Sequence, residues 1–365
     1  MSFLGRIKNW DWILIISATL LVLIGLASIY SSSLGKENFF NFKKQVIFLI
    51  LGFCLMFIFS LFDWRFIKSN SYLILFFYFL CVLLLAGLYF FAPQIRGVRS
   101  WYRIGPVFLD PIEIVKIVLI ILLAKYFSMR HVEMYRLKHI ILSGIYVLLP
   151  VILIFFQPEL GSALIIFSLW VVILIISGIK IRHFLLICFV IFLISISGWL
   201  FFLKDYQKQR ILTFLNPEEV APLGFGWNQK QAEIAIGSGG FLGKGLGNGS
   251  QTQYGFLPEN QTDFIFASLA EETGIFGILI LFIIFLIFIW RIIRIAILSR
   301  TNFTRLFASG LAALFVSEFF INIGMNLGVL PIVGISLPLV SYGGAGLLMA
   351  FVSLGILQGI RTEEL

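Results

Sequence analysis

Charged side chains are scarce in this chain of 365 residues. Only 12% of its residues are Asp, Glu, Lys or Arg, whereas 60% are apolar, and the mean hydropathy is +1.03. A soluble globular domain carries about 25% charged and about 45–50% apolar residues. The composition therefore excludes a soluble globular domain and predicts an integral membrane protein.

Cysteine and histidine are also rare, with three residues of each. Cys54, Cys81 and Cys188 lie inside apolar runs, and no Cys-x-x-Cys pair or neighbouring histidine accompanies them, so neither a disulfide framework nor a zinc site is indicated. The net charge of +9 is attributed to membrane orientation, not to nucleic acid binding. We expect no metal site and no nucleic acid partner, and the sequence indicates no cofactor.

Long apolar runs dominate the sequence. A hydrocarbon core about 30 Å thick needs about 20 residues of helix, and a helix satisfies its backbone polar groups internally. Ten such windows are Trp12–Tyr30, Val46–Phe62, Tyr72–Phe91, Ile112–Phe127, Ile140–Phe156, Leu160–Ser177, Phe184–Leu203, Phe264–Trp290, Leu306–Leu330 and Leu337–Ile360. The sequence predicts an all-α membrane protein of about ten transmembrane helices, forming a single polytopic domain over residues 1–365.

The distribution of lysine and arginine predicts the orientation. If the N-terminus is cytoplasmic, the inner segments carry fourteen of these cations and the short outer loops carry six, as the positive-inside rule requires. Both termini are then cytoplasmic, and residues 204–262 form a long extracytoplasmic loop between spans seven and eight. All three histidines fall on the cytoplasmic side, so carboxylates are the expected bases on the outer face.

Asp263 lies where this outer loop enters the eighth span. It is a candidate general base at the membrane interface. The competing interpretation is a helix cap, since an Asp at an N-cap stabilises a helix by roughly 0.5–2 kcal/mol.

Five ionisable residues stand out inside the predicted spans. Glu113 and Lys116 are three apart on one helix face, so they form either a structural ion pair or a substrate-facing pair. Glu271, like Glu318, is a functional candidate or the partner of a buried cation, because ionisable groups are costly in a bilayer. Glu272 points about 100° away from Glu271, so we expect only one of the two to face an interior cavity.

Glycine and arginine mark two further candidate sites outside the spans. The glycine-rich segment 237–249 around Lys244 is either an anion-binding nest or a tight loop that needs positive φ. Arg96, Arg99 and Arg103 flank Trp101, and they either bind a pyrophosphate or anchor the chain at the interface. Prolines and glycines also break the last two spans near Ser341, and broken backbone at membrane depth must line a cavity or be buried.

Five separated blocks resemble the SEDS family of polytopic cell-wall proteins. They are Arg99-Ser-Trp-Tyr-Arg-Ile-Gly-Pro with Asp110-Pro-Ile-Glu113-Ile-Val-Lys116; Gln157-Pro-Glu-Leu-Gly-Ser162; the stretch from Ala235 through Pro258-Glu-Asn-Gln-Thr-Asp263-Phe-Ile-Phe to Ala270-Glu-Glu; Asn322-Ile-Gly-Met-Asn; and Ser341-Tyr-Gly-Gly. The elements at Asn216 and Lys244 resemble the RodA type of the family more than the FtsW type, which acts in division.

The resemblance implies a peptidoglycan glycosyltransferase that polymerises lipid II into glycan strands at the outer face of the bacterial cytoplasmic membrane, in cell elongation and shape. Asp263 would deprotonate the acceptor 4-hydroxyl, which would displace polyprenyl pyrophosphate in one inverting step. Candidates for holding the substrate or its pyrophosphate are Arg99, Glu113, Lys116, Arg210, Lys244, Glu271 and Ser341. A divalent cation, Mg or Mn, is compatible with such a leaving group.

The same resemblance implies partners. A class B penicillin-binding protein would supply the transpeptidase, since no Ser-x-x-Lys occurs in the outer loop, and other membrane proteins of the elongation complex would join it. Two alternative functions remain: a flippase for the lipid-linked precursor, and a non-catalytic scaffold for cell-wall synthases. The absence of an internal repeat weighs against the flippase.

Overall fold

The computed structural model describes residues 8–35, 37–93, 100–104, 107–130, 137–157, 159–202, 208 and 225–364. This part of the chain contains ten long helices: α2 (Trp12–Leu34), α3 (Phe40–Leu61), α5 (Ser71–Phe91), α6 (Pro111–Ser128), α7 (Leu137–Phe156), α8 (Leu160–Ile176), α9 (Ile181–Ser197), α14 (Ile265–Leu298), α15 (Asn302–Asn326) and α16 (Gly344–Glu364). Eight are long and apolar enough to cross a membrane, α8 is a shorter apolar helix, and α6, which carries Glu113, Lys116 and Lys125, coincides with the predicted fourth window. The predicted all-α membrane fold is confirmed.

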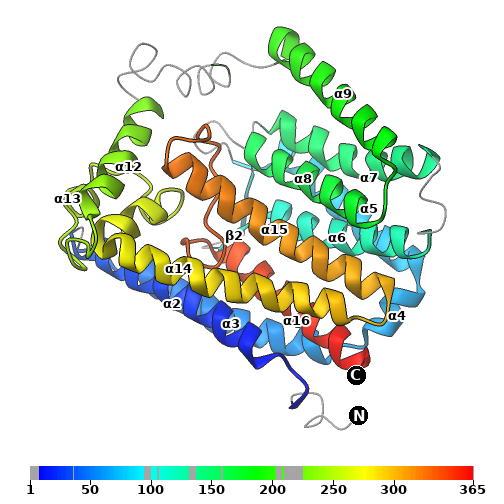
Figure 1. Cartoon of the computed structure of the whole chain (residues 1–365), viewed down its shortest axis with the longest axis horizontal. Helices are drawn as coiled ribbons and strands as arrows, with labels where there is room; N and C mark the ends of the chain where they lie inside the picture. The colour runs from blue at the N-terminus through cyan, green and yellow to red at the C-terminus, as the bar shows by residue number, and fades with distance from the viewer. Residues whose placement is uncertain are drawn as a thin grey trace.

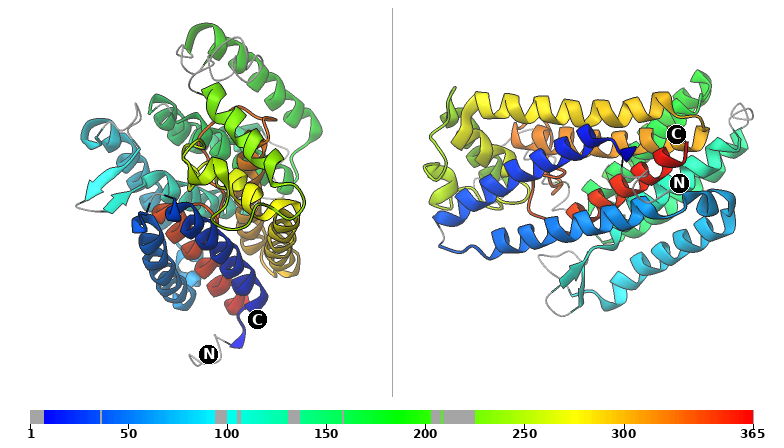
Figure 2. Two further views of the ribbon diagram at one scale, coloured as in Figure 1. Left: turned by 90° about the vertical axis from the view of Figure 1, so that its left-hand side faces the viewer. Right: turned by 90° about the horizontal axis from the view of Figure 1, so that it is seen from below.

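Shorter elements lie between these helices. They are α4 (Trp64–Ser69), the π-helical turn Gly198–Phe202 that follows α9, α12 (Phe225–Gly239), α13 (Ser250–Gln253) and an antiparallel hairpin of β1 (Tyr102–Ile104) and β2 (Val107–Leu109), in which Tyr102 pairs with Leu109. Figure 1 places α12 and α13 at one end of the bundle and α4 near the opposite end. The hairpin projects from the side of the bundle (Figure 2). The described part of the long connection before α14, residues 225–262, therefore contains helical structure.

Polar residues begin several helices. The side chains of Asp11, Asp63, Asn70, Asp110 and Thr301 accept hydrogen bonds from the first-turn amides of α2, α4, α5, α6 and α15. Such caps satisfy amides that have no partner within the helix. Asp11 also binds Arg291 of α14 and lies 3.5 Å from Arg361 of α16. The start of α2 and the last turn of α16 are thereby held at the same end of the bundle.

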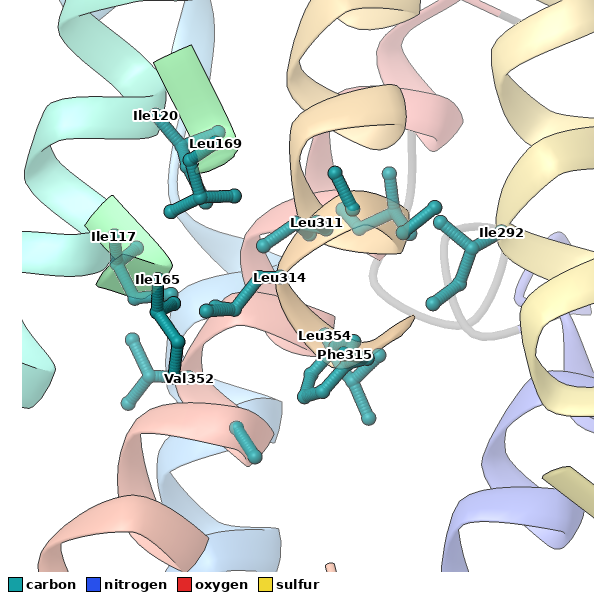
Figure 3. Close-up of a cluster of buried hydrophobic side chains, with 14 of the residues drawn as sticks. Ile117, Ile120, Ile165, Leu169, Ile292, Leu311, Leu314, Phe315, Val352 and Leu354 are labelled. Atoms are coloured by element: carbon teal, nitrogen blue, oxygen red, sulfur yellow. The ribbon is translucent and has the colours of Figure 1, made fainter. Parts of the chain in front are cut away.

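Helix α15 lies at the centre of the bundle. Its Leu311, Leu314 and Phe315 pack with aliphatic side chains of α6, α8 and α16 in the cluster shown in Figure 3. At the other extreme, α9 diverges from the bundle (Figure 1), and most of its apolar side chains, such as Phe189 and Phe192, are exposed. In a bilayer such exposed apolar surface faces lipid. The central position of α15 allows its polar residues to reach the site described next.

Candidate functional site

A cavity of about 810 Å³ lies between α3, α6, α8, α15 and α16 and the non-helical connection between α15 and α16. The charged residues in its described wall are five carboxylates and two lysines: Asp110, Glu113, Glu159, Asp263, Glu318, Lys44 and Lys116. Its apolar wall includes Ile47, Leu51 and Leu314. A cavity with both apolar and charged walls suits a substrate that is part lipid and part polar.

Asp263 lines this cavity, and its side chain is only partly buried. Helix α14 begins at Ile265 and its N-cap residue is Phe264, so Asp263 does not occupy the N-cap position that the cap interpretation required. Its backbone carbonyl instead accepts hydrogen bonds from the Nδ2 atoms of Asn322 (2.9 Å) and Asn326 (3.0 Å), one turn apart on α15. These two amides fix the backbone at Asp263, so its carboxylate is positioned from a rigid helix.

Lys116 is buried in the same cavity wall between two carboxylates. Its Nζ lies 2.6 Å from Glu113 Oε1 on α6 and 2.7 Å from Glu318 Oε1 on α15. The predicted Glu113–Lys116 pair is therefore confirmed, and Glu318, expected to be functional or the partner of a buried cation, is its third member. A lysine shared by two carboxylates carries no surplus positive charge for an anionic leaving group.

The connection between α15 and α16, residues 327–343, forms another wall of the cavity. The expected ninth and tenth spans are wrong here, because α15 ends at Asn326 and α16 begins only at Gly344. Pro331 and Pro338 lack the backbone amide that a helix needs as a hydrogen-bond donor. The positive φ angles of Gly328, Gly334 and Leu339 are also incompatible with a right-handed helix. The predicted break in the last two spans is confirmed, and it lines a cavity.

Ser341 joins this connection to the segment that carries Asp263. Its hydroxyl donates to the carbonyl of Thr262 (2.6 Å) and accepts from the amide of Leu337 (2.8 Å). Ser341 also lines the cavity. The structure thus brings Asp263, Glu113, Lys116 and Ser341, four of the expected site residues, to one place.

Glu271 and Lys244 lie elsewhere. Glu271 is fully buried, and its carboxylate accepts from Lys244 Nζ (2.8 Å), from the amides of Gln251 (2.9 Å) and Thr252 (3.0 Å), and from the Thr252 hydroxyl (2.9 Å). Neither residue lines the cavity. We call Lys244, Glu271 and Glu272, with the loop residues that they bind between 243 and 253, the loop clamp.

Glu272 belongs to the loop clamp too. Its Oε1 accepts from the Ser31 hydroxyl (2.6 Å), the Gly247 amide (3.3 Å) and Gln253 Nε2 (3.1 Å). The expectation that one of the two adjacent glutamates faces the cavity is therefore wrong. Both carboxylates bind the glycine-rich loop, Glu271 through Lys244 and Glu272 through the amide of Gly247.

The glycine-rich segment 237–249 is a tight loop with positive φ angles, which is one of the two structures predicted for it. Gly240, Gly243, Gly245 and Gly247 all have positive φ, and a Cβ at Gly243 would lie 2.1 Å from the carbonyl oxygen of Glu272. The amides of Lys244 and Gly245 donate to the carbonyls of Glu271 and Glu272, both at 3.0 Å. These amides are therefore occupied and do not form an anion nest.

Three residues of the cavity wall were not singled out as site residues from the sequence. Lys44 is one of the six cations of the predicted outer loops, and Glu159 is held by the hydroxyls of Ser162 (2.6 Å) and Ser100. Asp110 caps α6, and burial together with the nearby carboxylates of Glu159 and Glu113 raises its pKa well above the usual range. A Pro-Glu turn and an Asp-Pro helix start were the available signals, but neither indicates which side of the helix faces a cavity.

Arg99 and Arg210 lie outside the described residues, as does Arg96. Trp101 lines the cavity, whereas Arg103 is exposed on β1. Within the described ranges, no group of three or more His, Cys, Asp and Glu side chains has an arrangement that could hold a metal ion.

Comparison with known proteins identifies the family. Residues 10–365 match the FtsW/RodA/SpoVE family, described as a cell cycle protein. The peptidoglycan glycosyltransferase MrdB of Escherichia coli K12 is 35% identical over 97% of this chain and 95% of its own length.

Two solved structures share the fold along nearly the whole chain. One is a chain of a peptidoglycan synthase complex, from a structure on the coordination of polymerization and crosslinking. It matches with a TM-score of 0.84 and 28% sequence identity, over 97% of this chain and 98% of its own length. The rod shape determining protein RodA of Thermus thermophilus has a TM-score of 0.73 and 26% identity, covering 97% of each chain. This multi-pass bacterial inner-membrane protein therefore belongs to the FtsW/RodA/SpoVE family, the SEDS proteins whose motifs its sequence resembles.

Proposed function

We propose that the Asp263 cavity is the active site of a peptidoglycan glycosyltransferase that polymerises lipid II. The chain is a peptidoglycan glycosyltransferase like its relatives; the proposal concerns the substrate, the site and the chemistry. The observation that carries it is a partly exposed carboxylate, anchored through its own backbone to α15, in a cavity with both apolar and charged walls.

The chemistry needs a base and a place for a departing pyrophosphate. Asp263 takes the proton of the acceptor 4-hydroxyl, the oxygen bonds to the anomeric carbon of the donor sugar, and the bond from that carbon to the polyprenyl pyrophosphate breaks with inversion. A positioned general base contributes about 10²–10⁴-fold to such a step. The polyprenyl tail stays in the bilayer, which the apolar wall along α3 favours.

The charges of the cavity wall suggest where the leaving group lies. Lys116 is neutralised by Glu113 and Glu318, so within the described wall Lys44 is the cation better placed to stabilise a pyrophosphate. We propose Lys44 and Arg99 for this role, with Arg210 as a third candidate; Arg99 directly precedes Ser100, which binds the cavity residue Glu159. Glu113 and Lys116 then shape the cavity, and Ser341 positions the segment before Asp263.

We further propose that the end of the bundle bearing α12 and α13 faces outward and that both termini are cytoplasmic. The excess of lysine and arginine in the opposite segments supports this orientation. The solved relative in a synthase complex supports a class B penicillin-binding protein as partner for crosslinking. Other elongation-complex membrane proteins remain candidates from the sequence resemblance.

The test is polymerisation of fluorescent lipid II by the purified full-length chain in detergent, with and without its transpeptidase partner. We expect glycan strands from the wild type and none above background from Asp263→Asn. Asp63→Asn is the matched control, because Asp63 is an exposed cap of α4 outside the cavity. Near wild-type chain growth by Asp263→Asn would refute the assignment of the base, and transbilayer movement of lipid II in liposomes without chain growth would favour the flippase.

A further inference from the structure

A second, smaller cavity lies at the other end of the bundle, far from the α12–α13 end, where α14 and α16 terminate (Figure 1). Its volume is about 220 Å³, and six charged residues line it: Asp11, Arg291, Arg294, Arg300, Arg361 and Glu364. Four guanidinium groups from α14, α16 and the turn after α14 therefore converge on one hollow that holds only two carboxylates.

Both carboxylates are already engaged. Asp11 accepts two hydrogen bonds from Arg291, at 2.6 Å from Nη2 and 3.0 Å from Nε, and lies 3.5 Å from Arg361 Nη1. Glu364 accepts from the amide of Arg300 (3.0 Å) and from the hydroxyls of Thr301 (2.5 Å) and Thr304. The cavity thus keeps a surplus of positive charge.

Two observations show that this surplus is open to a ligand. Arg361 Nη1 is buried and, apart from the 3.5 Å ion pair with Asp11 Oδ2, has no hydrogen-bond acceptor among the described residues. Arg294 and Arg300 are exposed at the cavity, and within the described ranges neither side chain forms an ion pair. A buried guanidinium nitrogen without an acceptor is costly, and an anion would remove that cost.

We propose that this cavity binds a phosphate group. Guanidinium groups match phosphate oxygens in geometry and charge. A volume of about 220 Å³ is below the ~300–1,000 Å³ typical of sites for larger ligands, which favours a headgroup or a small anion. Two sources share this chemistry, an anionic lipid headgroup and free inorganic phosphate; Leu298, which lines the cavity and is 68% exposed, offers an apolar surface for an acyl chain.

The experiment compares two double variants of the full-length chain in detergent. Arg294→Gln/Arg300→Gln removes two cavity charges, whereas Arg182→Gln/Arg305→Gln removes two exposed charges outside the cavity and is the matched control. Native mass spectrometry measures retention of phosphatidylglycerol against phosphatidylcholine, and thermal unfolding measures the effect of inorganic phosphate against chloride at equal ionic strength.

We expect the cavity variant to bind phosphatidylglycerol or inorganic phosphate roughly fivefold more weakly for each arginine removed, and the control to behave as the wild type. Loss confined to phosphatidylglycerol identifies a lipid, and loss confined to inorganic phosphate identifies a free anion. Equal binding by the two double variants would overturn the proposal. Unfolding midpoints without ligand show whether the variants are folded.

Discussion

Two clusters of ionisable groups on neighbouring segments of this chain have opposite surroundings. Asp263 lines a cavity, and its backbone carbonyl accepts hydrogen bonds from Asn322 and Asn326 of α15. Glu271, eight residues later, is fully buried, and its carboxylate accepts from one ammonium, two amides and a hydroxyl of the loop clamp. A carboxylate surrounded by donors holds structure, whereas one that faces a cavity can exchange a proton with a substrate.

The largest expected effect is on turnover, and it separates the two clusters directly. Asp263→Asn should lower the polymerisation rate by about 10²–10⁴-fold with an unchanged unfolding midpoint, because it removes the base and leaves its backbone anchors in place. Glu271→Gln should do the reverse, with a lowered midpoint and near-normal specific activity of the folded fraction. Initial rates and thermal unfolding on the same samples check both variants, and a catalytic loss in folded Glu271→Gln would break the comparison.

The next largest effect is expected at Lys116. Lys116→Met leaves Glu113 and Glu318 facing each other without their cation, which should cost about 3–5 kcal/mol of unfolding free energy. Adding Glu318→Gln should recover part of that loss, because one uncompensated carboxylate is then neutral. Unfolding of both variants in detergent measures this coupling; a double variant no more stable than the single one would show that Glu318 does not depend on Lys116.

A smaller effect is expected in the loop clamp. Lys244→Met removes the only ammonium that binds Glu271 among the described residues, but two backbone amides and a hydroxyl remain, so we expect a loss of about 1–2 kcal/mol. The KM for lipid II should not change, since Lys244 lies outside the cavity. A raised KM with normal stability would restore Lys244 as a pyrophosphate ligand.

The smallest effect concerns pH. Burial and neighbouring carboxylates raise the pKa of Asp110. The folded protein therefore keeps a proton on this group that the unfolded chain loses near pH 4. As the pH rises above that value, Asp110 lowers the free energy of unfolding. Asp110→Asn keeps the cap and removes the titration. Its unfolding midpoint should exceed the wild type's by no more than about 2 °C at neutral pH, and the difference should vanish in acid; a constant difference at all pH values would contradict the assigned cause.

Much of the fold could be predicted from the sequence, because apolar runs of about 20 residues in lipid leave few alternatives to a helix. The ends of the last two spans could not, since Leu327–Leu330 and Leu337–Val340 are apolar but lie in a non-helical connection. Asp263 and the Glu113–Lys116 pair were also accessible to sequence reasoning. The contact of Lys116 with Glu318 spans 202 residues and depends on how α6 packs against α15, which no local pattern contains.

The sequence could not predict the structural role of the loop clamp residues Glu271, Glu272 and Lys244. In the sequence, the two glutamates look like intramembrane functional groups and Lys244 looks like an anion-binding cation of the outer loop. Only the positions of Ser31, Gln251, Thr252 and Gln253 show that the two carboxylates hold a loop. Burial cost predicts that such carboxylates need partners, but it does not predict whether the partner is the protein or a substrate.

The non-helical connection of residues 327–343 has an evolutionary consequence. A wall made of helix can change shape only by disturbing the packing of its neighbours, whereas a wall made of loop tolerates substitution and even changes in length. With the cavity proposed as the active site, the fit of substrates can therefore diversify along this one stretch while the packing of the surrounding helices stays the same.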